Sequence, residues 1–328
     1  MTTAPRPKRQ HHVPRFYLEH FTDENGDVWT YDNLKNTIRN SIPNETANET
    51  NLYSGLNDQG EYDDSIEKLL AGIEFKAAAI YPKVLRNENI TGQERADFAV
   101  FIATLCSRSP SLMNSYAEGL GYMAQHLTNV VMSKRSHFES SMDKFDQMKG
   151  KSTTQQERDD LFAFAKDPSR YTIQVDKKRG ISALGVADSI SPIIFDMTWF
   201  VFESADQHLI TSDNPVVQVN PPTDRHPVYG DGGFKNPNSN ISLPLSNRFL
   251  LGLAWLKARP SRIRTVNKQQ GRLFNCQRAS FAERYLYASK KDTGISALGQ
   301  KYKEPGLRIK VSGMEKLAPV EVIRNLVK

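Results

Sequence analysis

The sequence predicts an α+β fold, in which a helical first half packs on a mostly antiparallel sheet that C-terminal helices cover. Helical periodicity over residues 63–165, short strand-like runs over 199–256 and helical periodicity after 262 support this prediction. Clusters of Gly, Asn and Pro separate the strand-like runs, which is typical of antiparallel connections. At 328 residues, the chain is long enough for one large domain or two ordinary ones.

The first half of the chain carries most of the helical patterns. Four helices are expected there, over residues 63–81, 91–108, 112–145 and 158–165. The second is the best marked, because Thr91 followed three residues later by Glu94 forms a capping box. The first is expected to end at Pro82, since proline cannot donate a helical hydrogen bond.

Short apolar runs rich in β-branched and aromatic residues predict the strands. Strands are expected at residues 28–31, 37–42, 199–202, 209–211, 216–219, 241–245 and 249–256. Later helical patterns occur at 183–197, 262–276 and 279–288, and the last two are expected to cover the sheet. The expected organisation is a flexible basic arm at 1–10, a single domain at 11–290 and a C-terminal extension at 291–328.

Composition narrows the class of protein. The net charge of +6 and the sequence pI near 9.1 favour an anionic partner, nucleic acid first, although solvated basic tails explain part of the excess. The basic N-terminus has no apolar segment behind it, and no apolar run approaches the ~20 residues that span a bilayer. We therefore expect a cytoplasmic protein without membrane contact. Its two cysteines, Cys106 and Cys276, should be reduced.

The opening stretch from His11 to Leu18, His-His-Val-Pro-Arg-Phe-Tyr-Leu, concentrates groups that can do chemistry. His11 and His12 point to opposite faces of an extended segment, so only one of them can face a given pocket. Histidine titrates near neutrality, which suits general acid or base catalysis. With Arg15 and Tyr17 they are candidate catalytic residues. A purely structural N-terminal strand remains the alternative.

Three further candidates lie in distant segments. Glu67 is in the first turn of a predicted helix, where its carboxylate can orient a histidine, and Glu74 on the same helix looks more like a surface residue. Arg108 closes a helix, either as a charge that suits the helix dipole or as an anion clamp. Asp213 is in a Ser-Asp-Asn-Pro turn and could be structural, or could hold Mg²⁺ or another divalent metal together with Glu67.

Several short motifs follow the opening one along the chain: Val28-Trp29-Thr30-Tyr31, Asp64-Ser65-Ile66-Glu67, Arg108-Ser109-Pro110, Thr211-Ser212-Asp213-Asn214-Pro215 and Pro244-Leu245-Ser246. Together with the opening stretch, this set resembles an uncharacterised, mainly bacterial family, domain of unknown function 4238, from about residue 10 to about residue 290. No activity is established for that family, so the resemblance implies none. The opening residues also resemble the start of ββα-metal (HNH) nucleases, but no helical pattern carries the Asn or His that such nucleases need.

These residues suggest a phosphodiesterase acting on nucleic acid, a nuclease of a toxin or phage-defence kind. His12 would be the general base, Arg15 and Arg108 would hold the phosphate, and Glu67 and Asp213 would orient histidine or metal. The rival is a non-catalytic scaffold that binds nucleic acid or protein, in which Arg15 pairs with Glu67 and the histidines bond to the Asp213 turn. A hydrolase with Ser212 as nucleophile is weaker, because no Gly-x-Ser-x-Gly elbow occurs. The sequence leaves the oligomeric state and any protein partner open.

Overall fold

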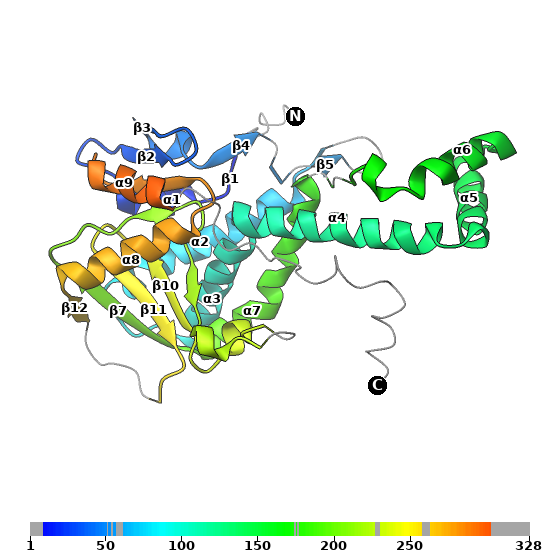
Figure 1. The fold of residues 1–328 in the computed structure, drawn as a ribbon. Helices are drawn as coiled ribbons and strands as arrows, with labels where there is room; N and C mark the ends of the chain where they lie inside the picture. The colour runs from blue at the N-terminus through cyan, green and yellow to red at the C-terminus, as the bar shows by residue number, and fades with distance from the viewer. Residues whose placement is uncertain are drawn as a thin grey trace, which may run out of the picture. The chain divides into compact units, whose positions relative to one another are not determined.

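The computed structural model confirms the α+β class, with a helical first half and mostly antiparallel sheets in the second half (Figure 1). Residues are described over 9–50, 52–53, 55–56, 62–173, 175, 177–226, 230–257 and 263–302. The chain divides into two compact units. We call residues 1–113 and 181–308 the α+β unit, and residues 114–180 and 309–328 the helical unit. The domain expected over 11–290 spans both.

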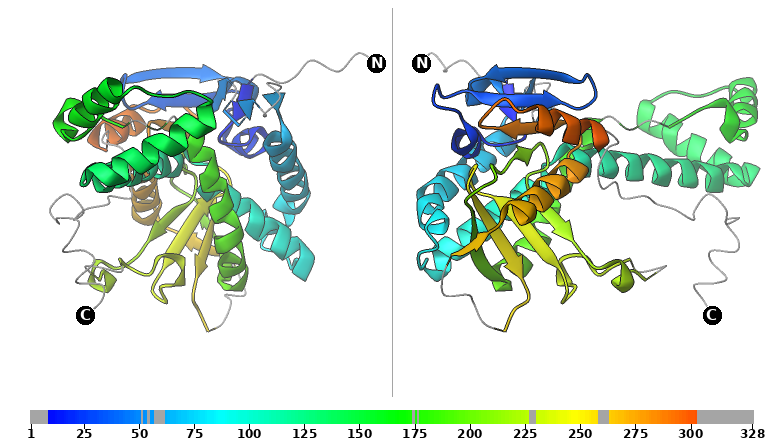
Figure 2. Two further views of the ribbon diagram at one scale, coloured as in Figure 1. Left: turned by 90° about the vertical axis from the view of Figure 1, so that its right-hand side faces the viewer. Right: turned by 60° about the vertical axis from the view of Figure 1, so that its left-hand side comes forward.

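The larger sheet of the α+β unit has five strands. Its order is β12 (Arg264–Val266), β7 (Thr198–Ser204), β11 (Phe249–Ala254), β10 (Asn240–Pro244) and β9 (Val217–Val219). Neighbouring strands are antiparallel except β12 and β7, which are parallel. Trp199 packs against Phe98 of α3 (Gly92–Ser107), whereas Phe202 packs against Phe274 of α8 (Lys268–Phe281). Since alternate residues of β7 face opposite ways, helices cover both faces, and Figure 2 shows α8 along one of them.

Helices α2 (Ser65–Leu85), α3 and α7 (Val186–Asp196) pack together beside this sheet. Helix α3 begins at the predicted capping box: Glu94 N donates to Thr91 Oγ1 at 3.1 Å, and Thr91 N donates to Glu94 Oε2 at 2.7 Å. Helix α2 continues past Pro82 to Leu85. A proline removes only its own N–H, and the later amides still find carbonyls, as Arg86 N does at Pro82 O (3.2 Å).

A second sheet brings the two ends of the α+β unit together. Its order is β3 (Thr37–Ser41), β2 (Val28–Asp32), β13 (Tyr285–Ala288) and β8 (Thr211–Ser212), and α9 (Thr293–Lys301) packs on β2. The single sheet that was expected is therefore two sheets. The helix predicted over 279–288 is wrong after Phe281, because the last four residues pair with β2 and β8. Leu286 and Tyr287 are both buried, so β13 lacks the apolar–polar alternation that marks a half-exposed strand.

Short elements complete the α+β unit. These are β1 (Arg9–His11), α1 (Arg15–Leu18), β4 (Asn48–Thr50), β5 (Gly55–Leu56), β6 (Tyr62–Asp63) and the 3-10 turns η1 (Glu19–Phe21), η2 (Pro43–Glu45), η5 (Pro222–Asp224) and η6 (Gly233–Lys235). The turn η4 (Lys177–Gly185) includes residues of both units. Strand β1 pairs antiparallel with β4, so Arg9 and Gln10 of the expected flexible arm belong to a strand. The rest of that arm, 1–8, and residues 303–328 of the expected extension lie outside the described residues.

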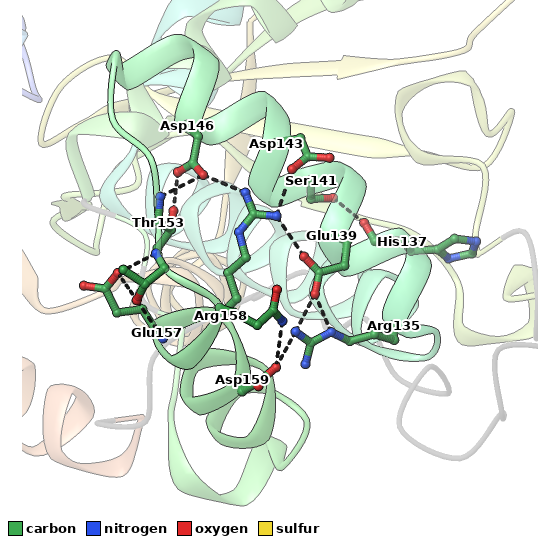
Figure 3. Close-up of polar contacts among 12 residues, drawn as sticks. Arg135, His137, Glu139, Ser141, Asp143, Asp146, Thr153, Glu157, Arg158 and Asp159 are labelled. Carbon is green, nitrogen blue, oxygen red and sulfur yellow. Dashed lines mark hydrogen bonds and ion pairs between the residues drawn. The ribbon is translucent and has the colours of Figure 1, made fainter.

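The helical unit contains most of α4 (Pro110–Met132), α5 (Arg135–Lys149), α6 (Gln155–Ala165) and the turn η3 (Pro168–Arg170). The single helix predicted over 112–145 is two helices, because the backbone of Lys134 is extended, with φ −135°. Arg158 of α6 ties α6 to α5. Its Nη1 donates to Glu139 and Asp143, both at 2.8 Å, and its Nη2 donates to Asp146 at 2.7 Å (Figure 3).

The structure bears on two of the predictions, the absence of a membrane-spanning helix and the reduced state of the cysteines. Within the described ranges, no helix is both long and apolar enough to cross a membrane. Cys106 and Cys276 are free thiols, as predicted. Burial raises the pKa of Cys106 to about 12, so that thiol stays protonated and inert at neutral pH.

Candidate functional site

Strand β1 and the residue after it place the two predicted histidines. The backbone N–H of His12 donates to Ala47 O at 3.0 Å, which fixes the chain where it leaves the strand. The His12 ring is buried, with 4% of the residue exposed, and His11 is partly buried. Neither Nδ1 nor Nε2 of His12, nor Nε2 of His11, has a hydrogen-bond partner among the described residues. Buried polar atoms without a protein partner are uncommon in native proteins, and they are one mark of a site that binds a polar group.

Arg108 lies at the C-terminal cap of α3, and only 1% of it is exposed. Its Nη1 donates to Glu74 Oε1 of α2 at 2.7 Å. Its Nε and Nη2 have no partner within the part of the chain that the structure describes. These two nitrogens form one edge of the guanidinium, and such an edge grips a carboxylate or phosphate with two parallel hydrogen bonds.

The electrostatics show that these side chains act on one another. Burial, together with the charges of Arg108 and His11, lowers the pKa of His12 to about 3. Burial also lowers the pKa of His11, while the backbone carbonyl of Asn44 and the carboxylate of Glu74 raise it. Both imidazoles are therefore neutral at pH 7. We call His11, His12, Glu67, Glu74 and Arg108 the Arg108 cluster.

Glu67 and Glu74 share one face of α2, and both contribute to the cluster. Burial raises the pKa of Glu67, and the charge of Glu74 raises it further, whereas Arg108 lowers it. Glu74 was expected to be a surface residue, but it is the ion-pair partner of Arg108. The seven-residue spacing from Glu67 was the available signal, because it repeats the same helical face.

Tyr53 and Gln10 lie beside this cluster, and no sequence motif marked either of them as a site residue. The Tyr53 hydroxyl donates to His11 O at 3.4 Å, and Tyr53 N donates to Gln10 Oε1 at 2.6 Å. Burial raises the pKa of Tyr53 above its ordinary value, and the charges of Arg108 and Glu67 also act on it. A protonated phenol therefore borders the cluster.

Arg15 and Tyr17 lie in α1 and have partners of their own. Arg15 is exposed and pairs with Glu19, Nε to Oε1 at 3.0 Å, so the Arg15–Glu67 pair of the scaffold hypothesis is not observed. Tyr17 is buried, and its hydroxyl donates to Pro244 O at 2.7 Å and lies 2.8 Å from Thr211 Oγ1. Tyr17 thus ties α1 to strands β8 and β10.

Asp213 is buried just after β8, and its carboxylate accepts three backbone hydrogen bonds. Oδ1 accepts from Glu283 N at 2.9 Å, and Oδ2 accepts from Arg284 N at 2.7 Å and Tyr285 N at 2.9 Å. Burial raises the pKa of Asp213 to about 7, against the pull of these three amides. The carboxylate holds the start of β13 and makes no bond to the ring nitrogens of His12.

The arrangement also bears on metal and nucleophile chemistry. Among the described residues, no group of three or more His, Cys, Asp and Glu side chains is placed to hold a metal ion. Of the two predicted metal ligands, Glu67 has Glu74, Arg108 and Asp64 as charged neighbours, whereas Asp213 has the 283–285 amides. The Ser212 hydroxyl donates to Asn214 O at 2.8 Å and accepts from Asn214 N at 3.2 Å, which makes it a turn residue.

Comparison with known proteins places the chain in a family but assigns it no activity. No curated protein and no solved structure matches it. A family described as a protein of unknown function matches residues 9–292, a span that contains every residue of the Arg108 cluster. The chain therefore belongs to that family, DUF4238.

Proposed function

We propose that this protein is a nucleic-acid phosphodiesterase in which the Arg108 cluster binds and hydrolyses the phosphate. The observation that carries the proposal is the Nε–Nη2 edge of a buried guanidinium. This edge has no partner among the described residues, and the guanidinium acts electrostatically on the buried imidazole of His12 and the partly buried imidazole of His11. A phosphate accepts two parallel hydrogen bonds from such an edge.

Arg108 would hold the phosphate, and Glu74 would fix the guanidinium through Nη1. The negative charge of the phosphate opposes burial and Arg108, so it raises the pKa of His12 toward neutrality. His12 then takes the proton of a water whose oxygen attacks phosphorus. The bond from phosphorus to the leaving sugar oxygen breaks, and that oxygen takes a proton from the carboxyl of Glu67, whose pKa is raised.

Nucleic acid is the favoured substrate because the chain carries a net charge of +6. The proposal includes a role as a toxin or in phage defence, in the cytoplasm, where cleavage of nucleic acid would harm the host or an invader. Arg15, Tyr17 and Asp213 are not needed for the reaction as written, because each has a structural partner.

The test is cleavage of single- and double-stranded RNA and DNA, with and without Mg²⁺, by the wild type and two variants. His12→Gln should lower the cleavage rate by about 10²- to 10⁴-fold, the usual range for loss of a general base. Arg108→Lys should weaken substrate binding while the charge beside Glu74 is kept. Arg86→Ala, which removes an exposed arginine paired with Glu88, is the matched control and should cleave at the wild-type rate. Wild-type cleavage by His12→Gln contradicts the proposal.

A scaffold that binds nucleic acid without cleaving it is the second candidate. The observation that favours it is the structural use of Tyr17 and Asp213, two of the residues expected to be catalytic. Binding that depends on Arg108, with no cleavage of any substrate, would select this candidate over the nuclease.

A further inference from the structure

Helix α4 has one covered face and one uncovered, apolar face within the helical unit. On one face, Ala117 and Gly121 are buried beneath the returning chain, and a Cβ at Gly121 would come within 3.2 Å of Ile173 O. Gln125 on the same face donates to Tyr171 OH at 3.3 Å. An apolar face of a helix is normally buried against another element. The second face therefore lacks a covering partner among the described residues.

The uncovered face is a stripe formed by Leu120, Met123, Leu127 and Val130. Met123 is 59% exposed, Leu127 is 61% exposed and Val130 is 38% exposed, while Leu120 is partly exposed. Their spacing of three, four and three residues is the spacing of a helix-pairing seam, in which each apolar side chain inserts between those of a partner helix. Figure 1 shows α4 as one long helix through this segment.

Charge indicates which partner fits the stripe. Residues 119–132 contain no Asp, Glu, Lys or Arg, whereas Glu118 precedes them and Lys134 and Arg135 follow them. If a second copy packs antiparallel on this stretch, the charges at the ends are complementary. The acidic end of each stretch then lies near the basic end of the other. Antiparallel helices also oppose their dipoles favourably. A closed pair with two-fold symmetry uses the same patch on both copies.

We propose that two copies of this chain associate through antiparallel packing of their α4 stripes. A two-fold axis near residue 125 pairs Leu120 with Val130 and Met123 with Leu127, and it places Glu118 opposite Met132, two residues from Lys134. The three most exposed stripe residues offer about 300 Å² per copy, taking roughly 150–200 Å² for each large side chain when fully exposed. The two copies together therefore contribute about 600 Å² through these residues, well below the roughly 1,200–2,000 Å² of a standard interface. The dimer is therefore a weak one.

Sedimentation equilibrium of the full chain measures this association. The wild type should dimerise at micromolar concentrations, and Leu127→Glu should weaken the dimer at least 100-fold, because two carboxylates then face apolar side chains. Phe75→Glu, at a 79% exposed aromatic residue of α2, is the matched control and should dimerise like the wild type. A monomeric wild type, or a Leu127→Glu variant that still dimerises, overturns the proposal.

A mixing experiment tests the register. Met123→Lys and Leu127→Glu should each be monomeric alone but should form a one-to-one dimer when mixed, since position 123 of one copy faces 127 of the other. No recovery on mixing overturns the antiparallel register. A variant truncated after Tyr302 tests the other possible occupant of the stripe, which is the C-terminal segment 303–328 of the same chain. Dimerisation that appears only after this truncation would assign the stripe to that segment and overturn the proposal.

Discussion

The guanidinium of Arg108 is almost completely buried, and among the described residues only its Nη1 is paired with a carboxylate. Burial of a charge is costly unless the charge is paired and its donors are bonded. The protein offsets part of this cost through Glu74 and leaves an N–H edge beside neutral histidines. An anion at that edge would complete the set of hydrogen bonds.

His12 gives a prediction at the residue scale through its depressed pKa. In the unfolded chain its imidazole binds a proton below pH 6.5, but in the folded chain it does so only below about pH 3. Between these values the unfolded state binds more protons, so stability falls as the pH drops through 6.5. The loss from this residue is about 2 kcal/mol at pH 5.

Urea unfolding of the wild type and His12→Gln at pH 7, 6 and 5 checks this loss. The stability of the wild type should fall by about 2 kcal/mol more than that of His12→Gln between pH 7 and 5, while the other histidines contribute equally to both. Parallel pH dependences would show that the imidazole is not held neutral by the fold.

We predict that Asp213 stabilises the fold and takes no part in the reaction. Asp213→Ala leaves three partly buried backbone N–H groups without an acceptor, and a buried group of this kind costs about 1–3 kcal/mol. Removal of a buried carboxylate recovers part of this, so we expect a net loss of about 2–4 kcal/mol in urea unfolding. Asp206→Ala, at an exposed carboxylate, is the control and should change stability little. Unchanged stability with lost cleavage would return Asp213 to the catalytic site.

The residue types of the candidate site could be predicted from the sequence, but their partners could not. His11, His12, Glu67 and Arg108 were expected, and the structure makes them act on one another. Asp213 has the same chemical character, yet its lone pairs are used by amides some seventy residues away. Such long-range backbone contacts leave no trace in local sequence, because any residue can supply an N–H group.

At the scale of elements, local sequence signals predicted correctly those helix boundaries that are determined by contacts between residues close in the chain. The capping box at Thr91 fixed the start of α3, because both of its hydrogen bonds join residues three apart. Strand β13 was predicted as a helix, because its strand character depends on pairing with β2 and β8 from other parts of the chain. Tertiary pairing overrides weak local preference in such strands.

The pairing of α5 with α6 gives a prediction at this scale. Arg158→Met removes the only cation that bonds at once to Glu139, Asp143 and Asp146 among the described residues, and it leaves these carboxylates to repel one another. Backbone amides of α5 and α6 should then exchange hydrogen faster, and added salt should reduce the difference from the wild type. Lys144→Met, at an exposed cation of α5, is the control. Equal exchange rates in all three proteins would contradict this role.

At the scale of the whole molecule, the α+β unit is closed by contacts between distant segments. Strands β2 and β3 from the N-terminal part share a sheet with β13 and β8, and α1 is tied to β8 and β10 through Tyr17. Strand β1, paired with β4, ends at His11, and His11 and His12 lie where the charge of Arg108 acts on both of them. The family match over 9–292 includes all of these elements.

The central claim is that Arg108 and the two histidines bind one anion. The most direct measurement is a titration with sulfate, which stays a dianion from pH 5 to 8, followed through the histidine ring signals in nuclear magnetic resonance. The His12 signals of the wild type and of Arg86→Ala should shift and saturate, because the bound charge raises the pKa of His12. Arg108→Lys should show no saturable shift. Wild-type His12 signals that do not move, or that move equally in Arg108→Lys, would contradict the claim.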